Sequence, residues 1–308
     1  MNGGTLPKSE RININKKIYN ITKDEALADY KKLSDLDCNK YKDLSKGSRI
    51  GSTFVDYFTS LQRMESNSKR NINFFDLWED RNKWIKKKSL SNMVDWYRKT
   101  SPETPLYSVW WRIFNLYFGS INQFKPLIAI GIYCRYKPSS VLDFTMGWGG
   151  RLVGACALNI GKYTGIDLNL DLKKPYENMV KELNPLTNTK IKLYFKDALT
   201  VDYNKLDYDL VLTSPPYYNI ELYKGTKIRT KEEWDKDFYE PIFIKTWNGL
   251  KVGGHYCLNV PVELYDRVCL KIMGKADELL PLYKAKRKEN ETYKEFIYVW
   301  KKTKNINI

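Results

Sequence analysis

The chain has 308 residues, 43% of them hydrophobic and 29% charged, which suits one large domain or a catalytic domain with a smaller appendage. Its 52 Lys and Arg outnumber 36 Asp and Glu, and the net charge of +16 favours nucleic acid over a membrane as partner. One histidine, His255, and five scattered cysteines without a Cys-x-x-Cys pair disfavour metal sites, Ser-His-Asp catalysis and a disulfide framework.

These bulk features predict an intracellular protein, cytoplasmic or nuclear, with free thiols and no metal. No stretch approaches the roughly 20 apolar residues that span a bilayer, and the first residues lack the apolar segment of a secretory signal. The oligomeric state cannot be read from the sequence. We therefore expect a protein that works in a reducing compartment and not in a membrane.

The first third of the chain predicts helices rich in aromatic residues. The first twenty residues are polar and predict a loose arm. Thr22 and Glu25 have capping-box spacing, which predicts a helix running to about Leu33. Aromatic residues at helical spacing then predict helices around residues 54–61, 75–84, 96 and 106–118. We interpret residues 1–105 as a basic, helical region that is a candidate for substrate recognition.

A Lys-rich segment with interleaved aromatic residues lies within that region. It includes Lys86 and Lys87, which could contact the phosphates of a nucleic acid. The alternative is a solvated helix face above a core of tryptophans, and the sequence leaves both open.

From Val141 onward short apolar strands alternate with helical patterns. The expected strands cover residues 141–144, 163–168, 191–198, 208–213, 255–260, 282–288 and 295–302. This alternation predicts an α/β domain over residues 106–304, with a doubly wound, mostly parallel sheet of seven strands and helices on both faces. The last two strands are close enough in sequence to pair as an edge hairpin. Ligands in such sheets bind at the carboxyl ends of the strands.

Four motifs fall at those strand ends. A glycine turn with Gly147 and Gly149 follows Asp143, whose carboxylate could accept a hydrogen bond from a ligand ammonium. Asp167 ends the second strand at a spacing that suits ribose hydroxyls, and Asp197 ends the third, where it could accept from an adenine amino group. Singly, each acid is more often a helix cap or a solvated charge. Together they describe a pocket for an adenosine with a charged amino-acid tail.

The fourth motif is Ser214-Pro215-Pro216-Tyr217 at the end of the fourth strand. Two adjacent prolines hold a stiff loop. The amino group of a base is a poor nucleophile because its lone pair is delocalised into the ring. Ser214 Oγ and the Pro215 carbonyl can accept its two hydrogens and favour the attacking geometry. Tyr217, with Tyr218 beside it, offers a face on which a flipped-out base can stack.

With these motifs the chain resembles the class I S-adenosylmethionine-dependent amino-methyltransferases of nucleic acids. Their catalytic motif is (Asp/Asn/Ser)-Pro-Pro-(Tyr/Phe/Trp), and its serine form is typical of cytosine-N4 enzymes. The resemblance covers roughly residues 120–300 and implies a Rossmann-like fold with S-adenosyl-L-methionine as cofactor. The implied cofactor-binding residues are Phe124, Lys125, Pro126, Asp143, Phe144, Thr145, Gly147, Gly149, Asp167, Leu168, Asp197, Ala198 and Thr213.

The chain departs from the family at the glycine turn. The family turn usually reads Asp-Pro-Phe-x-Gly-x-Gly, whereas Phe144 and Thr145 occupy the second and third positions here. The GWGGRL wording is similar to phage and large-virus variants. Only about 65 residues separate the turn from the Ser-Pro-Pro-Tyr loop, which is too few for an inserted recognition domain.

The sequence therefore predicts methylation of a base amino group in nucleic acid, with cytosine N4 in DNA favoured. Adenine N6 and RNA stay open as alternative base and polymer, and a glutamine side chain of a protein as a further acceptor. An inactive methyltransferase-like subunit would retain the fold without binding the cofactor. A pure nucleic-acid-binding protein would explain the charge but not the four motifs.

Overall fold

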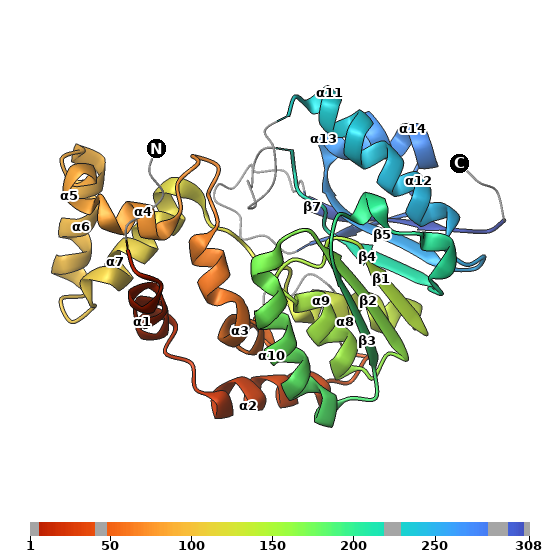
Figure 1. Cartoon of the computed structure of the whole chain (residues 1–308), viewed down its shortest axis with the longest axis horizontal. Coiled ribbons are helices and arrows are strands. Elements are labelled where there is room, and N and C mark those ends of the chain that lie inside the picture. Colours follow the sequence, from red (N-terminus) through yellow and green to blue (C-terminus); the bar gives the residue numbers. More distant parts are fainter. Residues whose placement is uncertain (1–5, 41–47, 219–228, 283–294, 305–308) are drawn as a thin grey trace.

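The computed structural model describes residues 6–40, 48–218, 229–282 and 295–304 (Figure 1). Its N-terminal helices are α1 (Lys8–Tyr19), α2 (Lys23–Ser34), α3 (Ser52–Glu65), α4 (Phe74–Glu79), α5 (Arg81–Trp84), α6 (Lys88–Thr100) and α7 (Leu106–Ile113). A π-helical segment, Phe114–Gly119, continues α7. The elements that follow are α8 (Pro126–Tyr136), β1 (Ser140–Asp143), α9 (Gly150–Ala157), β2 (Lys162–Asp167), α10 (Lys173–Leu183), β3 (Lys190–Phe195), β4 (Leu210–Thr213), α11 (Lys231–Trp234), α12 (Glu240–Asn248), β5 (His255–Pro261), α13 (Val262–Leu264), α14 (Leu270–Met273), β6 (Glu278–Pro281) and β7 (Glu295–Lys301).

The strands form one seven-stranded sheet in the order β3-β2-β1-β4-β5-β7-β6. The pairs from β3 through β5 are parallel, whereas β7 runs antiparallel to both β5 and β6. This confirms the expected Rossmann-like, mostly parallel sheet with a hairpin at its edge. The order steps outward from β1 in both directions, so a topological switch point lies between β1 and β4, where open α/β sheets bind their ligands.

Apolar residues fill both faces of the sheet because successive side chains of a strand point to opposite sides. Val141 packs with α8 and α9 in one core cluster, while its neighbour Leu142 packs with α12 in the other. Leu210 and Leu212 likewise face the first cluster and Val211 the second. Figure 1 shows the two sets of helices on opposite sides of the sheet.

The N-terminal helices form a third apolar cluster around Phe74, Trp110 and Phe114. The helix predicted from Thr22 is confirmed as α2, complete with its capping box. The loose arm expected for the first twenty residues is wrong, because residues 8–19 form α1. Ile14 of α1 is buried in this cluster and holds the otherwise polar helix against the N-terminal helices.

Packing crosses residue 105, the expected boundary between the N-terminal region and the α/β domain, in both directions. Val109 of α7 packs with the N-terminal cluster, whereas Tyr30 of α2 and Phe54 of α3 pack in the cluster on the sheet. The division into residues 1–105 and 106–304 stays a prediction.

Two further expectations change. Cys38, which follows α2, and Cys134 of α8 form a disulfide, so these thiols are not free; the fold brings together two residues 96 positions apart, which sequence spacing does not indicate. Cys156, Cys257 and Cys269 are free and buried. β6 lies before the strand expected at residues 282–288, and residues 283–288 lie outside the described part of the chain.

The described residues include no helix that is both long and apolar enough to cross a membrane. Among those same residues, no cluster of three or more His, Cys, Asp or Glu side chains could hold a metal ion.

Candidate functional site

The glycine turn connects β1 to α9 at the carboxyl edge of the sheet. Gly147 and Gly149 have φ of 56° and 101°, a region that glycine enters without strain. The Met146 amide donates to the Ile166 carbonyl at 2.9 Å, which fixes the turn against β2. A Cβ on Gly150 would lie 1.9 Å from the Phe124 carbonyl oxygen, so only glycine lets these two segments meet. The turn is therefore held closely on two sides.

A buried hydrogen-bond network lies beneath this turn. The Asp143 carboxylate accepts from Arg151 Nε at 2.7 Å, from the Tyr163 hydroxyl at 2.7 Å and from the Thr213 hydroxyl at 2.8 Å. Arg151 Nη2 also donates to the Thr145 carbonyl at 2.5 Å. Sequence reasoning missed Arg151 and Tyr163, because an Arg in a helix or a Tyr in a strand carries no signal of its partner.

Three expected cofactor residues belong to this layer of the structure. The side chains of Asp143, Phe144 and Thr213 have no exposed surface, and Phe144 packs near Phe243 in the core. These three side chains support the turn and the start of the loop, and the cofactor contacts expected of the three residues stay predictions. The Asp143 carboxylate, expected to accept from a ligand ammonium, pairs here with the Arg151 guanidinium.

Asp167 faces the turn from the end of β2. Its carboxylate accepts from the Gly147 amide and from the Asn169 amide, both at 2.8 Å. Burial raises the pKa of this carboxyl to about 6, and the two amide hydrogen bonds only partly oppose that shift. The next residue, Leu168, is 49% exposed and offers an apolar surface beside the carboxylate. Asp167 and Leu168 thus place a carboxylate and an exposed apolar side chain next to each other at the end of β2.

Asp197 and Ala198 follow β3. The Asp197 side chain is exposed and accepts from the Leu199 amide at 2.9 Å, which caps a short 3-10 turn. Ala198 is buried within that turn. This cap holds the Asp197 carboxylate at the carboxyl edge of the sheet. Its expected contact with adenine stays a prediction.

The expected Phe124-Lys125-Pro126 segment opens α8 next to the turn. Pro126 is the first residue of the helix, and Lys125 occupies the N-cap position without a side-chain hydrogen bond to the helix. The Arg151 guanidinium lies over the Phe124 ring, 4.9 Å from its centroid. Burial lowers the pKa of Lys125, and the positive charge of Arg49 adds to the decrease. Lys125 and Arg49 thus place positive charge at a segment whose residues are expected to bind the cofactor.

The Ser-Pro-Pro-Tyr loop lies directly beside the glycine turn. Thr145 of the turn and Thr213, which precedes the loop, share a hydrogen bond of 2.6 Å between their hydroxyls. Within the loop the Ser214 and Tyr217 hydroxyls lie 2.8 Å apart, and Tyr217 also donates to Asn259 of β5. Sequence reasoning missed Asn259, although an Asn inside the apolar strand CLNVP was a usable signal.

The far end of the loop is anchored to the helical layer. The Tyr239 hydroxyl donates to the Pro216 carbonyl at 2.5 Å and accepts from the Tyr218 amide at 2.9 Å. The Tyr218 ring is 6% exposed, and its hydroxyl donates to Asp235. Tyr217 is partly exposed and Tyr218 is not. The Tyr218 ring packs in the core and supports the loop, and the substrate contact expected of Tyr218 stays a prediction.

Lys86 and Lys87 lie elsewhere, between α5 and α6, at the end of the helical region that is remote from the sheet (Figure 1). Lys87 Nζ is 5.5 Å from the Tyr117 ring centroid, and the Arg70 guanidinium is 4.3 Å from it. Hydrogen bonds from Lys87 and then Arg70 lower the pKa of the Tyr117 hydroxyl to about 8. The structure does not bring these lysines to the strand ends.

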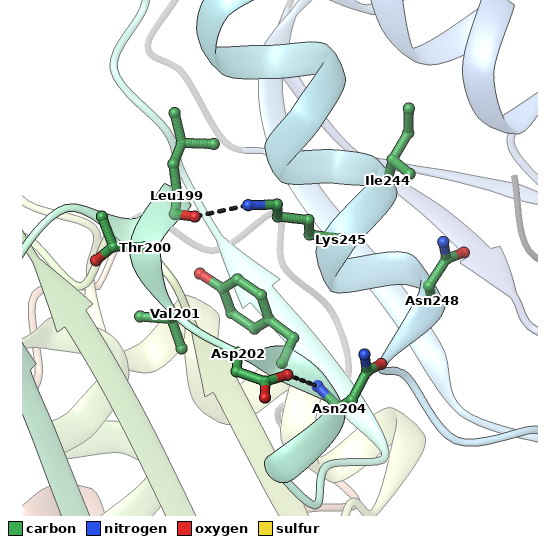
Figure 2. A pocket seen from close by; sticks show the side chains of 9 residues that line it. Leu199, Thr200, Val201, Asp202, Asn204, Ile244, Lys245 and Asn248 are labelled. Carbon is green, nitrogen blue, oxygen red and sulfur yellow. Dashed lines mark hydrogen bonds between the residues drawn. The ribbon is translucent and has the colours of Figure 1, made fainter.

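A cavity of about 380 Å³ opens between the turns that follow β3 and helix α12. Figure 2 shows that the Lys245 amine crosses it to the Leu199 carbonyl, and that Asp202 accepts from the Asn204 amide on its lower side. None of the candidate site residues lines this cavity. It is separate from the site at the strand ends.

No protein-family model matches the chain, and no curated protein matches its sequence. Its fold is similar to that of TrmN from Thermus thermophilus, at 16% identity over 59% of this chain and 50% of TrmN, with a TM-score of 0.41. An rRNA methylase from Streptococcus thermophilus matches at 15% identity over 54% of this chain and 87% of the methylase (TM-score 0.37). NSun6 from Pyrococcus horikoshii, solved with SFG, matches at 16% identity over 55% of this chain and 49% of NSun6 (TM-score 0.38).

The match to TrmN thus spans half of that protein's length. At these identities the likeness concerns the fold, which is established by the strand order and pairing of the chain itself.

Proposed function

We propose that this chain transfers a methyl group from S-adenosyl-L-methionine to the exocyclic amino group of a base in nucleic acid. Cytosine N4 in DNA is the favoured target, and adenine N6 or an RNA substrate is the alternative. One observation carries the proposal: the hydroxyls of Thr145 and Thr213 are 2.6 Å apart, so the glycine turn and the Ser214–Tyr217 loop meet at the switch point of the sheet. A donor on the turn and an acceptor on the loop would be neighbours.

The residues around the turn suit this cofactor. Asp167 offers carboxylate oxygens to ribose hydroxyls, and the exposed Leu168 offers an apolar face to adenine. Lys125, close to the positive charge of Arg49, suits the carboxylate of the methionine tail. Thr145, Gly147 and Gly149 supply backbone that a ligand can approach closely. When bound, the cofactor supplies a methyl group on a sulfonium, which a nitrogen can attack.

The loop residues then prepare the nucleophile. Ser214 Oγ and the Pro215 carbonyl accept the two hydrogens of the amino group, which turns the nitrogen lone pair out of conjugation and toward the methyl carbon. The amino proton that must leave when the nitrogen is methylated would pass along its hydrogen bond to Ser214 Oγ or the Pro215 carbonyl and on to water. The Tyr217 ring stacks on the base, a contact of about 1–3 kcal/mol.

The basic N-terminal region supplies the contact with the polyanion in this proposal. Residues 81–100 contain seven Lys or Arg and one acid, Asp95. Lys87 lies beside the Tyr117 ring, where ammonium and aromatic face together could bind a phosphate and a base. We propose residues 1–105 as the recognition region and residues 106–304 as the catalytic domain.

Labelled methyl transfer to DNA and RNA, followed by digestion and mass spectrometry of the nucleosides, tests the reaction. We expect N4-methylcytosine from DNA with the wild-type chain and a large decrease of the product with Ser214→Ala. Ser34→Ala, on the exposed end of α2, is the matched control and should be fully active. N6-methyladenine, or label only in RNA, would select the alternative substrate. Label in neither polymer, with the cofactor bound, would refute the proposal.

Salt-dependent binding tests the recognition region. Lys86→Gln with Lys87→Gln should weaken nucleic-acid binding and reduce the slope of log K against log salt by up to about 2, because each lost phosphate contact removes nearly one released counterion. Lys31→Gln with Lys32→Gln in α2 removes the same charge elsewhere and serves as control. Equal effects of the two pairs would show that net charge alone, and not this segment, drives binding.

A further inference from the structure

Asn259 joins the two hydroxyls of the candidate catalytic loop from the neighbouring strand. It lies in β5 and is 4% exposed. Its Oδ1 is 3.0 Å from the Tyr217 hydroxyl and 3.3 Å from Ser214 Oγ, and its backbone carbonyl is 2.9 Å from the Tyr217 hydroxyl. Parallel pairing of β4 with β5 brings Thr213 opposite Leu258. The next residues of the two segments, Ser214 of the loop and Asn259 of β5, therefore lie side by side.

The orientation of the Asn259 amide follows from its second contact. Its Nδ2 lies 3.1 Å from the Phe296 carbonyl of β7. A carbonyl oxygen only accepts, so the NH₂ end must face Phe296 and the oxygen must face the loop. β7 therefore fixes which end of the amide the two hydroxyls meet.

The Ser214 and Tyr217 hydroxyls share a small set of acceptors, which decides where the Ser214 hydrogen lies. Ser214 and Tyr217 have one hydrogen each, and the oxygens of Asn259 can only accept them. If Tyr217 donates to Asn259, then Ser214 donates either to Tyr217 or to Asn259 Oδ1; if Tyr217 donates to Ser214, then Ser214 donates to Oδ1. In each arrangement the Ser214 hydrogen stays within the cluster, and Ser214 Oγ keeps a lone pair for a further donor.

We propose that Asn259 is a positioning residue that holds the Ser214 hydroxyl as a hydrogen-bond acceptor and so selects an amino group over a keto oxygen at the reacting position. The inference rests on the proposed methyl transfer and deepens it. An amino group brings hydrogens to the Ser214 lone pair, whereas a keto oxygen brings a second acceptor and is repelled. Asn259 touches the loop and not the substrate, so its effect must pass through Ser214 and Tyr217.

A double-mutant cycle between Asn259→Ala and Ser214→Ala tests this dependence with the full chain and the nucleic acid that the wild-type protein methylates. We expect Asn259→Ala to lower kcat about 10- to 100-fold. The backbone carbonyl of residue 259 still accepts from Tyr217, but without Oδ1 the Ser214 hydrogen keeps only the Tyr217 hydroxyl as a partner and can turn into the acceptor position. The KM for S-adenosylmethionine should change less than twofold. In the Ser214→Ala background the Asn259 substitution should have little further effect, since the hydroxyl it orients is gone.

Asn259→Asp supplies a second variant if Asn259→Ala fails to fold. A neutral carboxylic acid can donate to the Phe296 carbonyl and accept from both hydroxyls, as the amide does, whereas a carboxylate places an unpaired acceptor against that carbonyl. With the cofactor saturating, the kcat of Asn259→Asp relative to wild type should be highest at low pH and fall as the buried acid ionises. The wild-type ratio at each pH removes the titration of other groups.

The outcomes separate the two proposals. Activity of the wild type, with losses from Asn259→Ala and Ser214→Ala that multiply in the double variant, overturns the role of Asn259 and leaves the proposed function standing. An Asn259→Asp activity that is independent of pH relative to wild type also overturns it. A wild-type chain that methylates no nucleic acid overturns the proposed function and this inference with it.

Discussion

Replacing Arg151 by Met should destabilise the chain strongly and weaken cofactor binding. The Arg151 side chain is 4% exposed and its partner Asp143 is fully buried, with 2.7 Å between Nε and Oδ2. The substitution leaves the Asp143 carboxylate in the core with two hydroxyl donors and no positive charge. Removal of one partner from a buried ion pair typically costs about 3–5 kcal/mol. The lost hydrogen bond to the Thr145 carbonyl adds about 1 kcal/mol and releases one side of the glycine turn.

Urea unfolding followed by far-UV circular dichroism measures the free energy of unfolding, and calorimetry of S-adenosylmethionine binding measures the effect on the turn. Arg135→Met is a matched control, since its pair with Glu278 is partly exposed, at 40% and 36% of the two side chains, and should be worth at most about 1 kcal/mol. The double variant Arg151→Met with Asp143→Asn should be more stable than Arg151→Met alone, because it removes the unpaired buried charge.

The reasoning would be refuted by an Arg151→Met variant that loses less than about 1 kcal/mol, which is the range of an exposed pair. A double variant less stable than the single one would also refute it, because Asp143 would then matter for its shape and not for its charge.

Three further predictions concern the Cys38–Cys134 disulfide, the Asp167 carboxylate and the close packing of Gly150 against Phe124. Reduction of the disulfide between Cys38 and Cys134, 96 residues apart, should lower stability by up to about 4–5 kcal/mol in thermal unfolding, while Cys38→Ser should not respond to reductant; an equal response would exclude the bridge as the cause. Burial raises the pKa of Asp167 to about 6, so the folded state binds more protons than the unfolded state between about pH 4 and 6, and its contribution to stability falls as pH rises through that window. Cofactor affinity, which needs the ionised acceptor, should instead fall as pH decreases below 6 in calorimetry, and Asp167→Asn should bind weakly without that dependence. Gly150→Ala should destabilise by about 1–3 kcal/mol or more and weaken cofactor binding, because its Cβ would lie 1.9 Å from the Phe124 carbonyl oxygen; unchanged melting and binding would contradict this.

The local sequence was sufficient for α2, for the strands from β1 to β5 and for the edge of the sheet where those strands end. Apolar runs bounded by turns predicted the strands from β1 to β5, and the spacing of Thr22 and Glu25 predicted the start of α2. These signals are local because strand alternation and helix capping involve residues only a few positions apart. The glycine turn and the Ser214–Tyr217 loop were found the same way, since a positive φ and a Pro-Pro turn are written in the residue types themselves.

Other features depended on partners distant in sequence. The polar segment of α1 is held in place because Ile14 packs into a cluster formed by later helices. Cys38 reaches Cys134 only when the segment after α2 packs near α8. The position of Asp143 at a strand end nominated it as a ligand contact, and only the fold showed that Thr213, 70 residues away, donates to its carboxylate.

The same division runs through the candidate site. Residue types and their positions at strand ends were enough to nominate Asp167, Ser214 and Tyr217. Only the tertiary structure, by pairing β4 with β5 and β5 with β7, placed Asn259 between the loop and the Phe296 carbonyl. A side chain's chemistry is local, but which donors and acceptors it meets is decided by strand pairing, and strand pairing joins residues that the sequence keeps far apart.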